Sequence, residues 1–117
     1  MEFILLLHSR EGGWAKLTPD EQNRWLKAYG KFTEDLIAAG AYKGGARLQR
    51  SKLAATVQTR NGKPLVTDGP FAETKEQLGG YYVIDVPSRR SAIAWAKKCP
   101  ASRHGVVEVR PLGWPMD

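Results

Sequence analysis

Residues 68–76 hold the densest group of side chains in this sequence that could do chemistry. The stretch reads Asp-Gly-Pro-Phe-Ala-Glu-Thr-Lys-Glu, so four charges surround a turn-forming Gly-Pro pair. Sites are often carried by loops that a rigid scaffold positions, and a carboxylate there can act as an acid or a base. We therefore take Asp68 as the first candidate catalytic residue. The alternative is structural, because Asp before Gly-Pro can accept hydrogen bonds from nearby backbone N–H groups as an Asx turn.

The other charged residues of this stretch, Glu73, Lys75 and Glu76, are candidate ligand-binding residues. Lys75 would suit an anionic or carbonyl-bearing ligand. The carboxylates could bind a polar ligand or cross an interface between subunits. The alternative is that the charges form a solvated face, as charge runs usually do.

The two histidines lie in different segments. His8 follows the first apolar run and is the second candidate catalytic residue, although a histidine at a strand end is more often an ordinary hydrogen-bonded residue. His104, next to Gly105 in an expected loop, is the weaker candidate. Together with the single cysteine, Cys99, they do not form a zinc pattern, and no phosphate or dinucleotide loop is present. We expect no metal and no cofactor, and we interpret Cys99 as a small apolar residue.

The first helix is expected to begin at Thr18-Pro19-Asp20-Glu21, which combines an N-cap, a proline at the first helical position and a capping-box glutamate. One face of this helix carries a leucine and three aromatic residues at helical spacing: Trp25, Tyr29, Phe32 and Leu36. Trp25 and Tyr29 are interpreted as core residues, with the lining of a ligand pocket as the alternative. They complete the set of candidate ligand-binding residues.

Two glycines mark the same helix. Gly40 is expected to end it as a C-terminal cap. Gly30 lies inside it at a cost of about 1 kcal/mol relative to alanine, which suggests the close approach of another element or of a ligand. We favour packing as the cause.

Strands and turns follow a recognisable order. Asn61-Gly62 is the strongest hairpin signal, because both central residues of a type I′ turn need positive φ. A second helix is expected over 88–98, and strands are expected over 3–7, 41–48, 54–59, 63–67, 81–86 and 106–109. The order is that of an α+β, ferredoxin-like βαββαβ unit with an antiparallel sheet and an inserted β-hairpin.

The strands over 3–7 and 81–86 are apolar on both faces rather than alternating. In a ferredoxin-like unit both helices cover one face of the sheet, so the other face would expose large apolar side chains to water. A second copy packed sheet to sheet is the simplest cover. We therefore expect a homodimer that forms a dimeric α+β barrel, with Trp114 crossing to the partner or sealing an end of the barrel.

Composition sets the remaining limits. A chain of 117 residues with 42% hydrophobic residues fits one domain over 1–117. The net charge of +6 is spread over several elements, so direct binding of nucleic acid is not expected. The longest apolar run is too short to cross a membrane and no leader precedes it, so we expect no membrane partner and a cytoplasmic location.

Residues 68–82, read as one block, resemble the signature of the DGPF proteins within the YCII-related family. The resemblance extends over nearly the whole chain, through the first helix and residues 55–57, 61–64, 94–96, 99–100 and 109–111. It implies a dimeric α+β barrel of ferredoxin-like units. It also implies a link to sigma-factor transcription regulation, since some relatives are encoded beside such factors. A His-Asp pair has been proposed for the wider family, with the histidine on the first helix, but residues 19–39 contain no histidine.

The resulting hypothesis is a homodimer that binds a small polar or anionic molecule in a cleft between the first helix and residues 68–76, with enzymatic activity left open. The alternative is a non-enzymatic interaction protein that contacts transcription machinery, which rests on analogy with the relatives.

Overall fold

The computed structural model describes residues 1–114. The elements, in chain order, are β1 (Glu2–Ser9), η1 (Trp14–Lys16), α1 (Pro19–Ala38), β2 (Tyr42–Arg47), η2 (Ser51–Leu53), β3 (Ala55–Arg60), β4 (Lys63–Asp68), β5 (Gln77–Asp85), α2 (Arg89–Lys98), α3 (Ala101–His104) and β6 (Val106–Pro111). The short helix α3 replaces the loop that was expected around His104.

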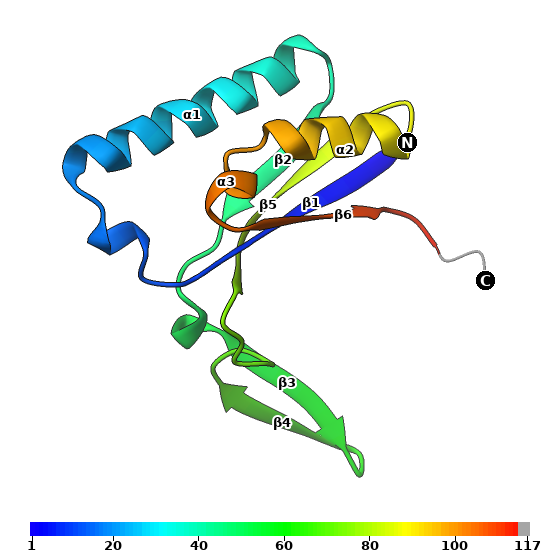
Figure 1. Ribbon diagram of the computed structural model, residues 1–117. Helices are drawn as coiled ribbons and strands as arrows, with labels where there is room; N and C mark the ends of the chain where they lie inside the picture. Colours follow the sequence, from blue (N-terminus) through cyan, green and yellow to red (C-terminus); the bar gives the residue numbers. More distant parts are fainter. Residues whose placement is uncertain (115–117) are drawn as a thin grey trace.

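Four strands form one antiparallel sheet in the order β2-β5-β1-β6, and helices α1 and α2 lie against one of its faces (Figure 1). This strand order confirms the ferredoxin-like α+β fold. Strands β3 and β4 form a separate two-stranded sheet that projects from the body, as expected for an inserted hairpin (Figure 1). Asn61 and Gly62 at its tip have φ of 51° and 75°, which confirms the predicted turn.

The ends of α1 follow the local sequence. Thr18 Oγ1 accepts a hydrogen bond from the Glu21 amide at 3.2 Å, and Glu21 Oε1 accepts one from the Thr18 amide at 3.0 Å. The predicted capping box is therefore present. Gly40, with φ of 70°, ends the helix in the left-handed conformation that glycine adopts without strain.

Gly30 does not behave as predicted. It is exposed, and a Cβ atom built on it would have no neighbour within 4 Å. The expectation that another element packs closely there is wrong, because Gly30 lies on the outer face of α1.

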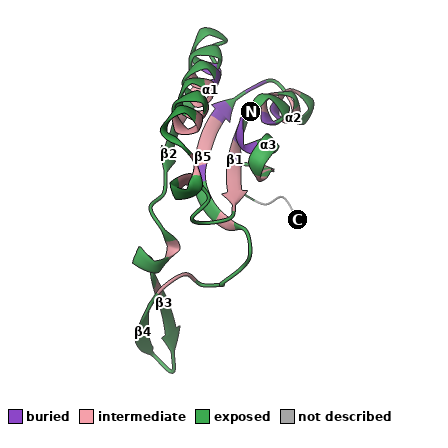
Figure 2. Ribbon diagram, turned by 60° about the vertical axis from the view of Figure 1, so that its left-hand side comes forward, coloured by how far each residue is buried: buried purple, intermediate pink, exposed green. Residues whose placement is uncertain are grey.

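The core lies between the helices and the sheet (Figure 2). Phe3 and Leu5 of β1 and Ile84 of β5 point toward the helices and are buried. They meet the buried residues of α1 and α2, which are Phe32, Leu36, Ala92 and Ala96. Cys99 is fully buried beside them, and burial raises the pKa of its thiol, so it serves as an apolar packing residue.

The opposite face of the sheet has no helix over it. Because side chains alternate along a strand, Ile4 and Leu6 of β1 point to this face, as do their partners Val83 and Tyr81 of β5. All four keep partial contact with solvent. The predicted two-sided apolar strands are therefore present, with one side uncovered.

The chain is open for its mass. Its accessible surface is 8771 Å², whereas a compact monomer of 13.0 kDa exposes roughly 6,300 Å². Its radius of gyration is 16.3 Å, compared with about 13 Å for a compact domain of this length. The projecting hairpin, which is coloured mainly as exposed in Figure 2, and the bare sheet face both contribute to this excess. No helix within residues 1–114 is both long and apolar enough to cross a membrane.

Candidate functional site

A cleft of about 800 Å³ lies between α1 and the helix-facing side of β2, β5 and β1. Residues of η1 and of the short helix α3 also line it. Besides His8 and Tyr81, which alternate to the opposite face of the sheet, it is lined by six ring side chains, and we call it the aromatic cleft: Trp14, Trp25, Tyr29, Tyr42, Tyr82 and His104. A largely apolar cleft of this size, with a few polar groups, is typical of a small-molecule site.

The polar centre of the aromatic cleft is a pair formed by Tyr29 of α1 and His104 of α3. The Tyr29 hydroxyl oxygen lies 2.7 Å from His104 Nε2, which is a short hydrogen bond. The Trp25 ring packs edge-on against the same imidazole, with ring centroids 4.8 Å apart and planes at 81°. Trp25 and Tyr29 are one helical turn apart, so α1 presents both to the same imidazole.

His104 is brought to this position by its neighbour Gly105. A Cβ atom at Gly105 would overlap the backbone carbonyl of His8 and lie 2.9 Å from Ser9 Cβ. Only glycine allows the start of β6 to approach the end of β1 so closely. The Gly105 amide also donates to the Ala101 carbonyl at 2.8 Å, which ends α3. The imidazole therefore projects from the junction of α3 and β6 toward α1.

The two groups of the pair are neutral at pH 7. Burial raises the pKa of the Tyr29 hydroxyl above its ordinary value, so it keeps its proton. Desolvation by partial burial lowers the pKa of His104, although the residue as a whole stays exposed. A neutral imidazole at the mouth of a cleft can accept a proton, and a tyrosine hydroxyl can donate a hydrogen bond to a ligand oxygen or relay a proton.

The part of the cleft wall formed by Thr33 and Tyr82 is held by a second set of hydroxyl hydrogen bonds. Thr33 Oγ1 donates to the Tyr29 carbonyl at 2.9 Å and lies 3.0 Å from the Tyr82 hydroxyl. Because Thr33 has used its only hydrogen, Tyr82 donates to Thr33. Tyr82 also packs edge-on against Phe32, with ring centroids 5.2 Å apart. Both hydroxyl groups are engaged in hydrogen bonds, so we assign Thr33 and Tyr82 to shaping the cleft rather than to chemistry.

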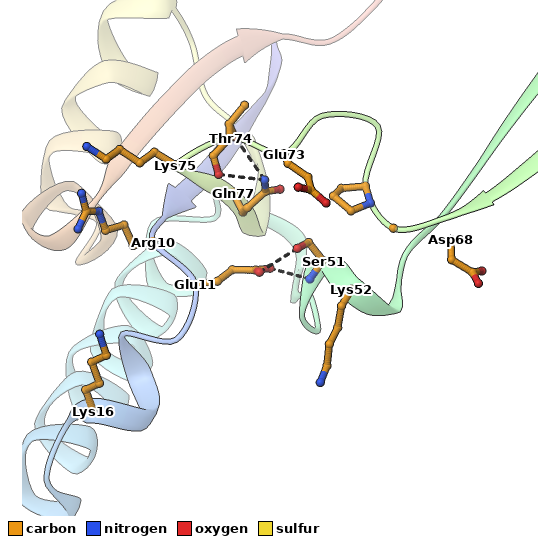
Figure 3. A pocket seen from close by; sticks show the side chains of 12 residues that line it. Arg10, Glu11, Lys16, Ser51, Lys52, Asp68, Glu73, Thr74, Lys75 and Gln77 are labelled. Carbon is orange, nitrogen blue, oxygen red and sulfur yellow. Dashed lines mark hydrogen bonds between the residues drawn. The ribbon is translucent and has the colours of Figure 1, made fainter.

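The charged segment lies at a second, more open groove of about 720 Å³, which we call the polar groove (Figure 3). Its lining includes four cationic side chains, Arg10, Lys16, Lys52 and Lys75. Figure 3 shows Arg10 and Lys75 on one side and Asp68 at the other end. Glu11 is bound to Ser51, accepting from its amide at 2.6 Å and from its hydroxyl at 2.8 Å. These bonds lower the pKa of Glu11.

The structure separates the predicted site residues. Trp25 and Tyr29 line the aromatic cleft together with Glu76, whereas Asp68, Glu73 and Lys75 line the polar groove. His8 borders the aromatic cleft, but its Nε2 lies 3.3 Å from Glu108 Oε1. Glu108 pairs with Leu6, whose side chain points away from the helices. The imidazole of His8 is therefore turned away from Tyr29, and its catalytic role stays a prediction.

Asp68 also lacks the structural contacts considered for it. Within residues 1–114 its carboxylate makes no hydrogen bond or ion pair. The turn is held instead by the Gly69 amide, which donates to the Ala54 carbonyl at 2.7 Å, and by Thr56 Oγ1, which donates to the Gly69 carbonyl at 2.8 Å. The roles proposed for Asp68, Glu73 and Lys75 stay predictions.

His104, which the sequence ranks as the weaker histidine, is the histidine that the structure places next to Tyr29 in the aromatic cleft. The sequence signal for its position is the stretch 101–104 between Pro100 and Gly105, which is long enough for one turn of helix. That turn presents its last residue to α1 only because β6 pairs with β1 in the right register. The proximity to Tyr29, which is 75 residues away, cannot be read from local sequence.

Comparison with known proteins places the chain in a family. The model of the YCII-related domain matches residues 1–114. The chain belongs to the YCII-related family. This YCII-related chain is 34% identical over 114 residues to an uncharacterised protein of Rhizobium meliloti (strain 1021), a match that covers 96% of the chain and 92% of the relative.

A solved structure shares the fold of this YCII-related chain. It is 5-chloro-2-hydroxyhydroquinone dehydrochlorinase from Burkholderia phenoliruptrix AC1100, in complex with 2,5-dihydroxybenzoquinone. The TM-score is 0.55 and the sequence identity is 14%, over 97% of this chain and 94% of the other. At this identity the likeness concerns the fold.

Proposed function

We propose that this YCII-related protein binds a small planar aromatic molecule in the aromatic cleft and transfers a proton on it through Tyr29 and His104. The observation that carries the proposal is the 2.7 Å bond between the two side chains, in a cleft otherwise walled by aromatic rings. Aromatic walls suit a flat ring ligand, because stacked or edge-on ring pairs are favourable beyond the area they bury.

The proposed step is a relay. A ring hydroxyl of the ligand gives its proton to the Tyr29 oxygen while the Tyr29 proton passes to His104 Nε2. The ligand becomes an anion and the imidazole becomes an imidazolium, so charge and protons balance. Tyr29 is half-buried and His104 is exposed at the mouth, so the proton leaves to solvent from the outer member of the pair. Reversal of the relay returns a proton to the anion at oxygen or, because the negative charge is shared with the ring, at a ring carbon; loss of the original hydrogen from that carbon through the forward relay then exchanges it with solvent.

The compound bound to the dehydrochlorinase supports a planar ring with hydroxyl groups as the class of ligand. That enzyme was solved with 2,5-dihydroxybenzoquinone, a small planar ring with two hydroxyl groups. The aromatic cleft has room for a molecule of that size. This compound is therefore the first probe for the present chain.

The test uses binding and proton exchange. Titration calorimetry measures binding of 2,5-dihydroxybenzoquinone, and NMR in D2O follows exchange of its ring C–H protons. We expect binding by the native chain and exchange that falls about 100-fold or more in Tyr29→Phe and in His104→Gln. Lys52→Met in the polar groove is the control and should change neither measurement. Absence of binding, or equal exchange in all four proteins, would refute the proposal.

The working form is proposed to be a homodimer joined through the bare sheet face. The apolar strip of Ile4, Leu6, Tyr81 and Val83 needs a cover, and the chain exposes about 2,400 Å² more than a compact monomer. Trp114, 93% exposed in the single chain, fits a residue that meets a partner. Sedimentation at micromolar concentration should give a dimer for the native chain and for Lys27→Glu on α1, and a monomer for Leu6→Glu. A native chain that stays single would refute this arrangement.

The alternative function, an interaction protein linked to sigma-factor transcription regulation, stays a prediction based on the family resemblance. A cytoplasmic location, a catalytic role for Asp68 and the binding of an anionic ligand by Lys75 also stay predictions.

A further inference from the structure

We infer that Arg47 makes the aromatic cleft selective for rings that carry a negative charge, such as a ring carboxylate or phenolate. This inference rests on the proposed function of the cleft. It goes beyond the proposed function by specifying the charge of the ligand and the residue that recognises this charge.

Arg47 points into the cleft. It is the last residue of β2 and pairs with Gly80, which in turn pairs with Leu7 on β1. Leu7 packs against the core on the helix-facing side, and paired residues share a face, so Arg47 is also on that side. Its guanidinium carbon lies 4.8 Å from the centroid of the Trp14 ring. Both residues line the cleft.

The guanidinium lies over the Trp14 ring, and its N–H groups make no hydrogen bond within residues 1–114. A cation over an aromatic face is held by the ring quadrupole, while the donors of a planar guanidinium lie along its edge. This edge can bind a carboxylate with two parallel hydrogen bonds. Trp14 and Arg47 thus form a preorganised anchor at the rim of the cleft.

Arg47 has no acidic partner in the described part of the chain. The ion pairs there join the N-terminus to Asp85, His8 to Glu108 and Lys31 to Asp35. The acidic residues that line the cleft are Glu11 and Glu76. Glu11 is engaged by Ser51, and Glu76 lies near enough to His104 to affect its pKa. The positive charge of Arg47 is therefore available to a ligand.

The charge of Arg47 reaches the polar centre of the cleft. Together with Arg103, it acts on the Tyr29 hydroxyl in the direction that lowers its pKa, although burial has the larger effect and the pKa ends raised. An anion bound beside Tyr29 would experience the same positive field. A neutral ring would leave the Arg47 donors to water, so the two ligand types should bind with different affinity.

The test compares two ligands of nearly equal shape, 2,5-dihydroxybenzoate and 2,5-dihydroxybenzamide, by titration calorimetry. We expect the native chain to bind the benzoate about 10- to 100-fold more tightly than the amide. Arg47→Met should bring this preference below about 3-fold and change amide binding little. Arg47→Lys should give an intermediate preference, because an ammonium keeps the charge but loses the two-bond geometry. Arg60→Met, on the hairpin, is the matched control and should behave like the native chain.

The outcomes separate the two proposals. If both ligands bind and Arg47→Met keeps the full preference for benzoate, the Arg47 inference is overturned and the cleft proposal stands. If neither ligand binds the native chain, both are overturned. Circular dichroism melting checks that Arg47→Met is folded, and Arg47→Gln replaces it if it is not.

Discussion

Replacing Gly105 by alanine tests how the fold positions His104. The added methyl group would overlap the His8 carbonyl and lie 2.9 Å from Ser9 Cβ. Both neighbours are parts of β1 that cannot rotate away, so β6 must shift from β1 at the His8–Val106 pair. Forcing an extra methyl group into such a contact costs about 2–3 kcal/mol, which corresponds to a decrease in Tm of roughly 10 °C for a domain of this size.

The same shift should also separate His104 from Tyr29. Their oxygen–nitrogen distance is 2.7 Å, so a displacement of about 1 Å takes the pair out of hydrogen-bonding range. Gly79→Ala is the matched control, because its Cβ would lie 3.8 Å from the Leu7 carbonyl oxygen, an ordinary contact. Thermal melting measures stability, and imidazole NMR signals report the Tyr29 bond. Equal Tm values for the two variants, within about 2 °C, would show that Gly105 does not set the approach of β6 to β1.

Two further predictions concern α1 and the Tyr29–His104 pair. Gly30→Ala should raise the free energy of unfolding by about 0.5–1 kcal/mol, because the exposed site has room for a methyl group and glycine weakens a helix interior. Urea unfolding measures this change, and a lower free energy of unfolding in the variant would contradict the prediction. The lowered pKa of His104 means that the unfolded chain binds its proton more readily than the folded chain. The free energy of unfolding should therefore decrease as pH falls from 7.5 to 5.5, through the ordinary histidine pKa of about 6.5. Urea unfolding at the two pH values should show a smaller decrease for His104→Gln, and an equal decrease would count against the lowered pKa.

Features set by neighbouring residues could be predicted from the sequence. The start of α1 depends on Thr18 and Glu21, which are three positions apart, and the hairpin turn depends on Asn61 and Gly62. Strand order followed from the order of elements, because the ferredoxin-like unit is a common solution for that order. The apolar residues on both faces of β1 indicated that the sheet has a second apolar face, which the helices do not cover.

The candidate site could be predicted only in part, because it depends on contacts between distant residues. The helical spacing of Trp25 and Tyr29 placed them on one face but did not show that this face borders a cleft. His104 and Arg47 reach the cleft through strand register, which local sequence does not encode. Asp68 was chosen because a Gly-Pro pair and three charged residues follow it, but the structure places it in the polar groove rather than in the aromatic cleft.

The projecting hairpin also affects how the chain can fold. Strands β2 and β5 are neighbours in the sheet, although residues 48–76 separate them. The 2.7 Å bond from the Gly69 amide to the Ala54 carbonyl closes the base of the hairpin. Once this base has formed, the remaining connection is much shorter, so less loop-closure entropy opposes the pairing of β2 with β5. The insertion of residues 48–76 therefore opposes the pairing of β2 with β5 with the loop-closure entropy of a much shorter loop.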